Sequence, residues 1–296
     1  MKKSVCIISF VTAISMLSIP FSNATAGEDD YQPSLRFKPI ETEEAQIIRN
    51  GSVYVNSSLL NDQNNAFDAE VYIIDEQKQV GHIIAKWKCD SEYIKLANLK
   101  DPITLCGHSP YSNFTTSNSI ATTEHPELNR HYLSYSLGLY TDPFDLTGET
   151  SYDYPIAGFS AVVNNETPAG KYAIEFMSGE SGAQCEILYK YKDSNDFKEF
   201  MPAGDYAKPI NINVSDRMLG DINNDGIITG SDATMVLQEY TYLSSGGQNS
   251  YFTTEQQIAA DINDDGIITG TDATWLLQYY TSLSSGCEDS IYDYFL

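Results

Sequence analysis

The sequence predicts an all-β sandwich at residues 51–214, followed by a small all-α domain at residues 216–286. Between residues 51 and 214, short runs of Tyr, Val, Ile and Phe alternate with turn residues, and long helical periodicity is absent. From Asp216 onward, a twelve-residue segment occurs twice, and each copy precedes apolar residues at helical spacing. These features together indicate two domains of different class.

Seven strands are expected in the sandwich, which is enough for one domain with its own core. The candidates are Ser52–Asn56, Ala69–Ile74, His82–Lys88, Tyr132–Tyr140, Gly158–Val163, Tyr172–Met177 and Cys185–Tyr191.

Two segments flank or interrupt these strands. Residues 27–50 are mostly polar, contain Pro33 and Pro39, and are expected to form an extended lead-in with a short helix at Glu41–Arg49. Residues 102–126 are rich in Ser, Thr, Asn and Gly, which predicts a long loop.

The N-terminus has the layout of a secretory signal peptide at residues 1–26. Lys2 and Lys3 precede an apolar run, and the triplet Ala24-Thr25-Ala26 predicts cleavage after Ala26. The net charge of −24 argues against nucleic acid or an anionic membrane as a partner. We therefore expect a secreted, soluble protein.

Four cysteines remain after cleavage: Cys89, Cys106, Cys185 and Cys287. Export permits disulfides, but the connectivity does not follow from the sequence. The spacing does not match a zinc site of the Cys-x-x-Cys kind.

The repeated segment has the ligand spacing of a calcium loop. Calcium takes six to eight oxygen ligands, which a twelve-residue loop supplies from positions 1, 3, 5, 7, 9 and 12, with Gly at position 6. The candidate ligands of two structural Ca²⁺ ions are Asp221, Asn223, Asp225, the carbonyl of Ile227, Thr229 and Asp232, and in the second copy Asp261, Asn263, Asp265, Ile267, Thr269 and Asp272.

The repetition continues beyond the loops. Aligning residues 220–246 with residues 260–286 leaves 20 of 27 positions identical. The residues Ala233, Val236, Tyr240 and Leu243, and likewise Ala273, Leu276, Tyr280 and Leu283, recur at helical spacing. Each loop is therefore expected to precede a helix with one apolar face.

The segments around these helices carry further signals. Thr254 with Gln257 is interpreted as a capping box that opens a helix before the second loop, whereas no equally long helix is expected before the first. Aromatic residues in the tail, residues 287–296, either cover the open end of the helical core or fray.

A tandem of calcium loop and helix, with Asp at the twelfth position and strong internal repetition, resembles a dockerin, the plug module of cellulosomes. The resemblance covers residues 216–286 and implies two EF-hand-like calcium loops and a cohesin as partner. It also implies two near-equivalent docking faces. The contact residues carried over by position are Gly230, Ser231, Leu237, Gln238 and Tyr242, with Gly270, Thr271, Leu277, Gln278 and Ser282 in the second copy.

Recognition is expected to be more apolar than in clostridial dockerins. Those often carry a Ser/Thr pair at loop positions 10 and 11 and a basic pair in the helix, whereas this chain has Gly with Ser or Thr and then Leu-Gln. The pattern is reminiscent of ruminococcal systems.

Two stretches of the sandwich resemble a cohesin. The stretch at 159–176 alternates, turns at Pro168-Ala-Gly170 and alternates again, and the stretch at 83–99 is similar to a cohesin strand and shoulder. Both also fit carbohydrate-binding modules of the related jelly-roll sandwich. The sandwich would accordingly bind a second dockerin or a polysaccharide.

A catalytic sandwich remains as a further alternative. Paired carboxylates could serve a glycosidase, but none is distinguished by context, and Glu175 is expected to point to solvent. His125 and His131 do not form a His-Glu-x-x-His motif. Candidates for sugar stacking are Trp87, Tyr111, Tyr132, Tyr135, Tyr140, Tyr152 and Tyr154, with core packing as the other interpretation.

The sequence thus predicts a non-catalytic, secreted cellulosome component, attached at the cell surface through a scaffoldin. It would act as an adaptor in plant polysaccharide degradation. The alternatives are a carbohydrate-binding dockerin protein and a small glycoside-active enzyme.

Overall fold

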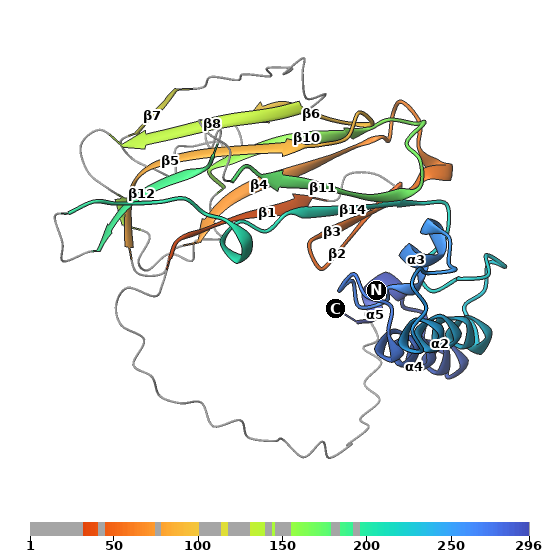
Figure 1. Ribbon diagram of the computed structural model, residues 1–296. Helices are drawn as coiled ribbons and strands as arrows, with labels where there is room; N and C mark the ends of the chain where they lie inside the picture. Colours follow the sequence, from red (N-terminus) through yellow and green to blue (C-terminus); the bar gives the residue numbers. More distant parts are fainter. Residues whose placement is uncertain are drawn as a thin grey trace, which may run out of the picture.

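Two layers of β-sheet are followed by a group of helices at one end of the sandwich (Figure 1). The computed structural model describes residues 32–40, 45–74, 78–100, 114–117, 131–139, 144–145, 155–178, 184–191 and 196–295. Within these ranges, no helix has the length and apolar character needed to cross a membrane.

The smaller layer has four described strands in the order β1-β4-β10-β6. Their bounds are Ser34–Ile40 (β1), Ala66–Ile74 (β4), Ala157–Val163 (β10) and Ile94–Lys100 (β6). All three pairings are antiparallel.

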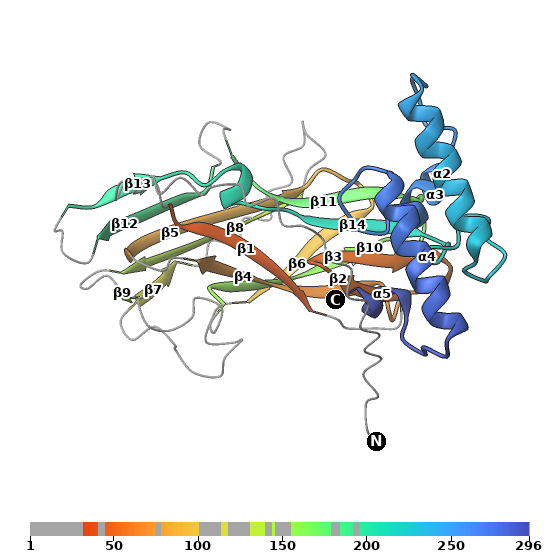
Figure 2. The same cartoon turned by 90° about the horizontal axis from the view of Figure 1, so that it is seen from below.

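The larger layer follows the order β13-β12-β5-β11-β14-β3-β2 (Figure 2). These strands are Lys198–Phe200, Glu186–Tyr191, Lys78–Cys89, Gly170–Phe176, Ile210–Ser215, Ser52–Asn56 and Gln46–Arg49. β8 (His131–Leu139) and β9 (Phe144–Asp145) pair with β5, and β7 (Phe114–Ser117) pairs with β8. Short 3-10 turns lie at Ser57–Leu59 (η1) and Gly204–Tyr206 (η2).

An aromatic cluster fills the space between the two layers. The rings of Phe37 on β1 and Phe176 on β11 stack with centroids 3.8 Å apart. Trp87 on β5 packs against Phe159 on β10 at 5.2 Å. Each contact joins one strand of each sheet, so burial of these rings holds the layers together.

The sequence-based strands are all present. β3 has the predicted bounds, and β4, β5, β8, β10, β11 and β12 overlap the other six with shifted ends. β-Branched and aromatic residues in alternating runs fit a pleated surface that is buried on one side, which explains why they were found.

The predicted lead-in contains two further strands, β1 and β2. The prediction of a helix at Glu41–Arg49 is wrong over the part of this range that the structure describes. Gln46–Arg49 is a strand, β2, which pairs with β3. β7 likewise lies inside the predicted 102–126 loop. The rest of that loop and the predicted signal peptide are outside the described residues.

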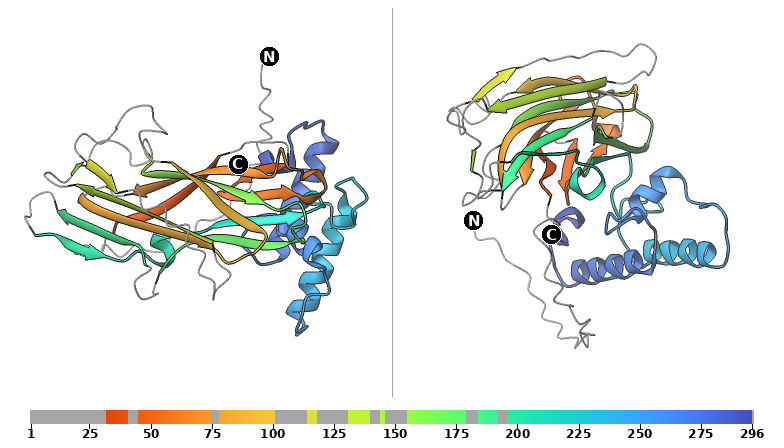
Figure 3. Two further views of the ribbon diagram at one scale, coloured as in Figure 1. Left: turned by 90° about the horizontal axis from the view of Figure 1, so that it is seen from above. Right: turned by 60° about the vertical axis from the view of Figure 1, so that its left-hand side comes forward.

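Four helices follow the sandwich (Figure 3): α2 (Gly230–Ser244), α3 (Thr254–Ala260), α4 (Gly270–Ser284) and α5 (Ile291–Tyr294). The predicted helix before the second loop exists, but its capping box uses Thr253 and Gln256 rather than Thr254 and Gln257. In the stretch from residue 196 to the first loop, the only helical element is η2, as expected.

A second hydrophobic core lies under these helices. It contains Ile222, Val236 and Leu276, together with Tyr54 from β3 of the sandwich. α3 contacts β11 and β14, and α5 contacts β2. The helical module is therefore packed directly against one end of the sandwich.

The tail folds back onto this core. Ile291 is buried, and the ring of Phe295 stacks on Trp275 of α4 with centroids 4.7 Å apart. Of the cysteines, Cys89, Cys185 and Cys287 are buried and free, and Cys106 lies outside the described residues.

Candidate metal loops and docking face

The first repeated segment, Asp221–Asp232 (loop 1), folds around its own acidic side chains. Asp221 accepts hydrogen bonds from the backbone N–H groups of Asp225 (3.1 Å) and Gly226 (2.8 Å). Asp225 accepts from the N–H of Ile227 at 2.9 Å. Gly226 has a φ of 82°, which glycine adopts without strain. The acidic side chains of loop 1 are therefore held by the loop's own backbone N–H groups.

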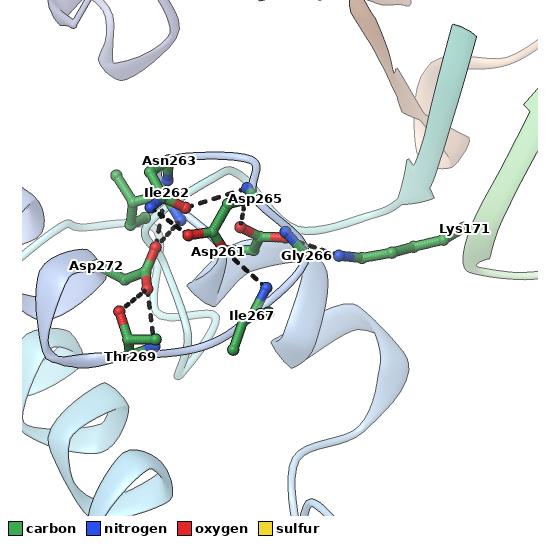
Figure 4. Close-up of polar contacts among 9 residues, drawn as sticks. All are labelled: Lys171, Asp261, Ile262, Asn263, Asp265, Gly266, Ile267, Thr269 and Asp272. Carbon is green, nitrogen blue, oxygen red and sulfur yellow. Dashed lines mark hydrogen bonds and ion pairs between the residues drawn. The ribbon is translucent and has the colours of Figure 1, made fainter. Parts of the chain in front are cut away.

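Loop 2, Asp261–Asp272, repeats this geometry (Figure 4). Asp261 accepts from the N–H groups of Asp265 and Gly266, both at 3.1 Å, and Asp265 accepts from Ile267 at 2.8 Å. The amide of Asn263 donates to Asp265 at 2.7 Å. The repeat is thus structural as well as sequential.

The last two predicted ligand positions of each loop also cap the helix that follows. Thr229 is the N-cap of α2, and Asp232 accepts from its N–H at 3.0 Å, which completes a capping box. Thr269 and Asp272 do the same for α4, at 2.8 Å. Because each cap satisfies free N–H groups at a helix start, loop and helix form one unit.

The donor set fits a hard cation. Asp221, Asp232, Asp261 and Asp272 are buried carboxylates, and burial raises the pKa of Asp272 even though Thr269 and Asn263 donate to it. Loop 1 carboxylates have no ion pair among the described residues. A divalent ion would supply the missing positive charge.

The predicted calcium ligands of each loop include groups other than carboxylates. Within the described ranges, no three His, Cys, Asp or Glu side chains are grouped as a metal site would hold them. The predicted ligand set is mixed, however, because each loop adds an Asn amide oxygen, a Thr hydroxyl and a main-chain carbonyl to its three Asp residues. Such a mixture is typical of calcium loops.

The predicted docking residues mostly lie on the surface of α2 and α4. Leu237 and Leu277 are 42% and 41% exposed, and their neighbours Gln238 and Gln278 are also exposed. Ser231 and Thr271 are exposed at the helix starts, where Gly230 and Gly270 are half-buried. Equivalent residues of the two copies are therefore exposed to a similar degree at these positions.

The apolar face differs from the predicted one at two tyrosines. Ala233, Val236, Ala273 and Leu276 are buried as expected, but Tyr240 and Tyr280 are 40% and 38% exposed. Glu239 and Tyr279 are buried in their place. Leu243 and Leu283 are half-buried. Tyr240 and Tyr280 therefore enlarge the exposed surface, which the helical spacing alone did not indicate.

The two faces differ at their ends. Tyr242 is 45% exposed and its ring lies 5.4 Å from that of Tyr251. Its counterpart Ser282, predicted as a contact residue, is only 4% exposed, and its carbonyl accepts from the N–H of Cys287 at 3.0 Å. Ser282 is therefore covered by the chain that follows it.

The structure also shows where some of the other residues considered for sugar binding or catalysis lie. Trp87 is fully buried, so it is a core residue and offers no face to a sugar. Glu175 is exposed on β11, as expected. The side chains of His125, His131, Tyr111, Tyr132, Tyr135, Tyr140, Tyr152 and Tyr154 lie outside the described residues.

Several solved structures and one family model are similar to parts of this chain. The chain is similar to the seventh ScaB type I cohesin from Pseudobacteroides cellulosolvens, at 11% identity over 52% of this chain and 85% of that chain, with a TM-score of 0.33. It is also similar to a chain of the Coh-OlpA-Doc918 complex from Clostridium thermocellum, at 12% identity over 61% and 99%, with a TM-score of 0.33.

A third similar structure is a chain from the complex of the third ScaB cohesin of R. flavefaciens with a group 1 dockerin, at 15% identity over 51% and 86%, with a TM-score of 0.32. No curated protein matches the chain. The family model for the dockerin type I domain matches residues 219–280, which span both loops and most of α4. The chain therefore contains a type I dockerin domain at residues 219–280.

Proposed function

We propose that the protein is a secreted, non-catalytic cellulosome component that docks onto a cohesin through the exposed faces of α2 and α4. The observation that carries this proposal is the dockerin domain at residues 219–280. The matched exposure of Leu237 and Leu277 on its two helices supports it. Attachment to a cohesin of a scaffoldin would bring the protein to the cell surface.

The two loops are proposed to bind one calcium ion each. Loop 1 would use Asp221, Asn223, Asp225, Ile227, Thr229 and Asp232, and loop 2 the equivalent residues. Bound calcium would neutralise the buried carboxylates. Backbone N–H groups of each loop orient these side chains. The capping boxes link the end of each loop to the start of α2 or α4, so a change in the loop would affect the helix.

Calcium removal tests the role of the loops. Because four carboxylates are buried, the helical module should lose most of its helix in EDTA and regain it in millimolar calcium. Circular dichroism measures the helix, and Trp275 fluorescence reports on α4. Trp87, buried in the sandwich, is the internal control once each tryptophan is replaced in turn by Phe. Identical spectra and melting curves in EDTA and calcium would contradict the proposal.

Docking is proposed to use either helix. Leu237→Ala and Leu277→Ala should each weaken binding to a cohesin partially, and the double variant should abolish it, because the remaining face can substitute for the altered one. Binding is measured against a cohesin panel by calorimetry, with Glu199→Ala, an exposed change on β13 of the sandwich, as a surface control. Complete loss from Leu237→Ala with no effect of Leu277→Ala would restrict docking to one face.

The sandwich is proposed to be a socket for a second dockerin, which would make the protein an adaptor scaffoldin. The two stretches that resemble a cohesin correspond to β5–β6 and β10–β11, each of which crosses between the two sheets. A carbohydrate ligand is the alternative, but burial of Trp87 removes its one candidate tryptophan in the sandwich.

The test of the sandwich should use the full chain, because Tyr54 and Ile47 of the sandwich pack into the helical core. A Leu237→Asp/Leu277→Asp variant disables the docking faces and leaves the sandwich unchanged. Binding to a dockerin panel supports the adaptor, and retention on insoluble polysaccharide supports a carbohydrate module. Release of reducing sugar would contradict the non-catalytic role.

A further inference from the structure

The two calcium loops differ in what surrounds them. Lys171, on β11 of the sandwich, places its Nζ 2.8 Å from Oδ2 of Asp261, the first ligand position of loop 2 (Figure 4). The equivalent residue of loop 1, Asp221, has no lysine or arginine partner among the described residues. Among the residues that the structure describes, loop 2 is therefore the one that meets a positive charge from the sandwich.

Loop 2 also lies against the sandwich at a second point. Asp264 is half-buried beside the hydroxyl groups of Ser52 and Tyr54 of β3. Tyr54 is buried, and its ring packs against Tyr292 with centroids 5.6 Å apart. The residue equivalent to Asp264 in loop 1, Asn224, is exposed. The two copies of the sequence repeat thus lie in two different environments.

The Lys171 contact leaves the rest of Asp261 in its loop geometry. Oδ2 also accepts from the N–H of Gly266, and Oδ1 accepts from that of Asp265. A cavity of about 190 Å³, lined by Lys171, Asn211, Asn213 and Asp264 among others, lies beside the contact. Lys171 is 42% exposed, so water screens its charge in part.

We propose that Lys171 makes the two calcium sites unequal and couples loop 2 to the sandwich. This inference rests on the proposed calcium binding. The ammonium group partly neutralises Asp261 and repels a divalent ion, so loop 2 binds calcium more weakly than loop 1. By reciprocity, calcium in loop 2 weakens the Lys171–Asp261 contact by the same factor. With loop 1 occupied and loop 2 empty, Lys171 holds loop 2 against the sandwich.

Calcium titration of paired variants tests this inference. Asp225→Ala disables loop 1 and Asp265→Ala disables loop 2, so each background leaves one site to be measured by calorimetry on residues 27–296. In the Asp225→Ala background, Lys171→Met should tighten calcium binding about tenfold, as expected for one nearby screened charge. In the Asp265→Ala background it should change nothing.

Two controls make the result specific to the charge. Lys208→Met removes a lysine that pairs with exposed Asp205 and precedes β14, the strand whose other end leads to loop 1, and it should leave both constants unchanged. Lys171→Arg keeps the positive charge and should retain the weak site. If Lys171→Arg and Lys171→Met gave the same affinity, the charge would not be the cause.

The possible failures are distinguishable. If neither site binds calcium in the unaltered protein, both the calcium proposal and this inference are overturned. If both sites bind but Lys171→Met leaves the loop 2 constant unchanged or weakens it, only this inference fails. Circular dichroism in saturating calcium confirms that every variant is folded before the constants are compared.

Discussion

Asp68 connects three strands of the smaller sheet through its two oxygens. Lys100 of β6 donates to Oδ2 at 2.8 Å, and Ser160 of β10 donates to Oδ1 at 2.6 Å. Burial acts to raise the pKa of Asp68, but the hydrogen bonds from Lys100 and Ser160 outweigh it and hold that pKa below its usual range. The ionised form is therefore favoured by folding.

The contribution of Asp68 should depend on pH. A carboxyl whose pKa is lowered in the folded state stabilises the protein above its unfolded pKa, near 4, and loses this contribution as the pH falls through the folded pKa. Asp68→Asn should cost about 0.5 kcal/mol at pH 7, a value reduced by solvent screening, and almost nothing at pH 2. Urea unfolding at both pH values checks this, with exposed Asp205→Asn as the control. An equal cost at both would contradict it.

Two glycines of the dockerin share a backbone conformation but not a neighbourhood. Gly220 and Gly226 have φ values of 85° and 82°. A Cβ at Gly220 would lie 2.7 Å from Ile291 and 2.9 Å from Leu276, whereas one at Gly226 would meet no atom within 4 Å. The first glycine is required for packing as well as for conformation.

Alanine substitutions separate these two requirements. Gly226→Ala should lower the free energy of unfolding by about 1–2 kcal/mol, the cost of a left-handed non-glycine residue. Gly220→Ala should cost a further 1–3 kcal/mol or so, because the added methyl group overpacks the core. Chemical unfolding in saturating calcium measures both. Equal costs would show that the core adapts to the methyl group at position 220.

At the scale of elements, the sequence indicates the helices better than the faces that they bury. Ala233 and Val236 were correctly expected in the core, but Tyr240 was assigned there only because tyrosine counts as apolar. The residue buried instead is Glu239 in α2 and Tyr279 at the equivalent position of α4. Because one of them is charged and the other aromatic, no apolar pattern shared by the two copies marks this position. A ring with a polar tip can lie on a surface or in a core, and its neighbours decide which.

Adjacent leucines of α4 should show this division of roles. Leu276 is fully buried and Leu277 is 41% exposed. Leu276→Ala should destabilise the dockerin by about 2–5 kcal/mol through lost burial and a cavity. Leu277→Ala should change stability by less than about 0.5 kcal/mol and act on docking instead. Melting curves and cohesin binding are measured on both variants, and a stability loss common to both would contradict the assignment.

The strands show a similar limit of prediction. The seven predicted strands lie where alternation is regular, whereas β1 was missed because Pro39 and two charged residues, Arg36 and Lys38, interrupt it. β1 is the edge strand of its sheet, where a missing N–H group is tolerated, so proline does not exclude it. The conformation of the two loops was predictable because it depends on residues close together in the sequence. The Lys171–Asp261 contact was not, because its partners are 90 residues apart.

At the scale of the whole molecule, the C-terminal tail joins the dockerin to the sandwich. The hydroxyl of Tyr292 accepts from the N–H of Leu219 at 3.1 Å, and its ring meets Tyr54 of β3. The sequence left two alternatives for the tail, covering the core or fraying, because nothing local identifies Tyr54 as its partner. The structure shows the tail folded back.

Removal of the buried tail residue should therefore affect the entire helical module. Ile291→Ala should lower its free energy of unfolding by about 2–5 kcal/mol. Asp293→Ala, an exposed change in the same helix, should have little effect. Unfolding is followed by Trp275 fluorescence in calcium. Similar stability of the Ile291→Ala variant and the unaltered protein would show that the tail adds nothing to the core.

The strand β14 ends at Ser215, and only residues 216–220 separate it from Asp221 of loop 1. Arg217 ties this connection at both sides: its N–H donates to the hydroxyl of Ser215 at 3.0 Å, and its guanidinium donates to the carbonyl of Ile222 at 2.6 Å. The short connection is thus held by hydrogen bonds at both ends. If either helix face docks as proposed, the sandwich would project from a scaffold in two alternative directions, one for each face, and would present a different side to its neighbours in each.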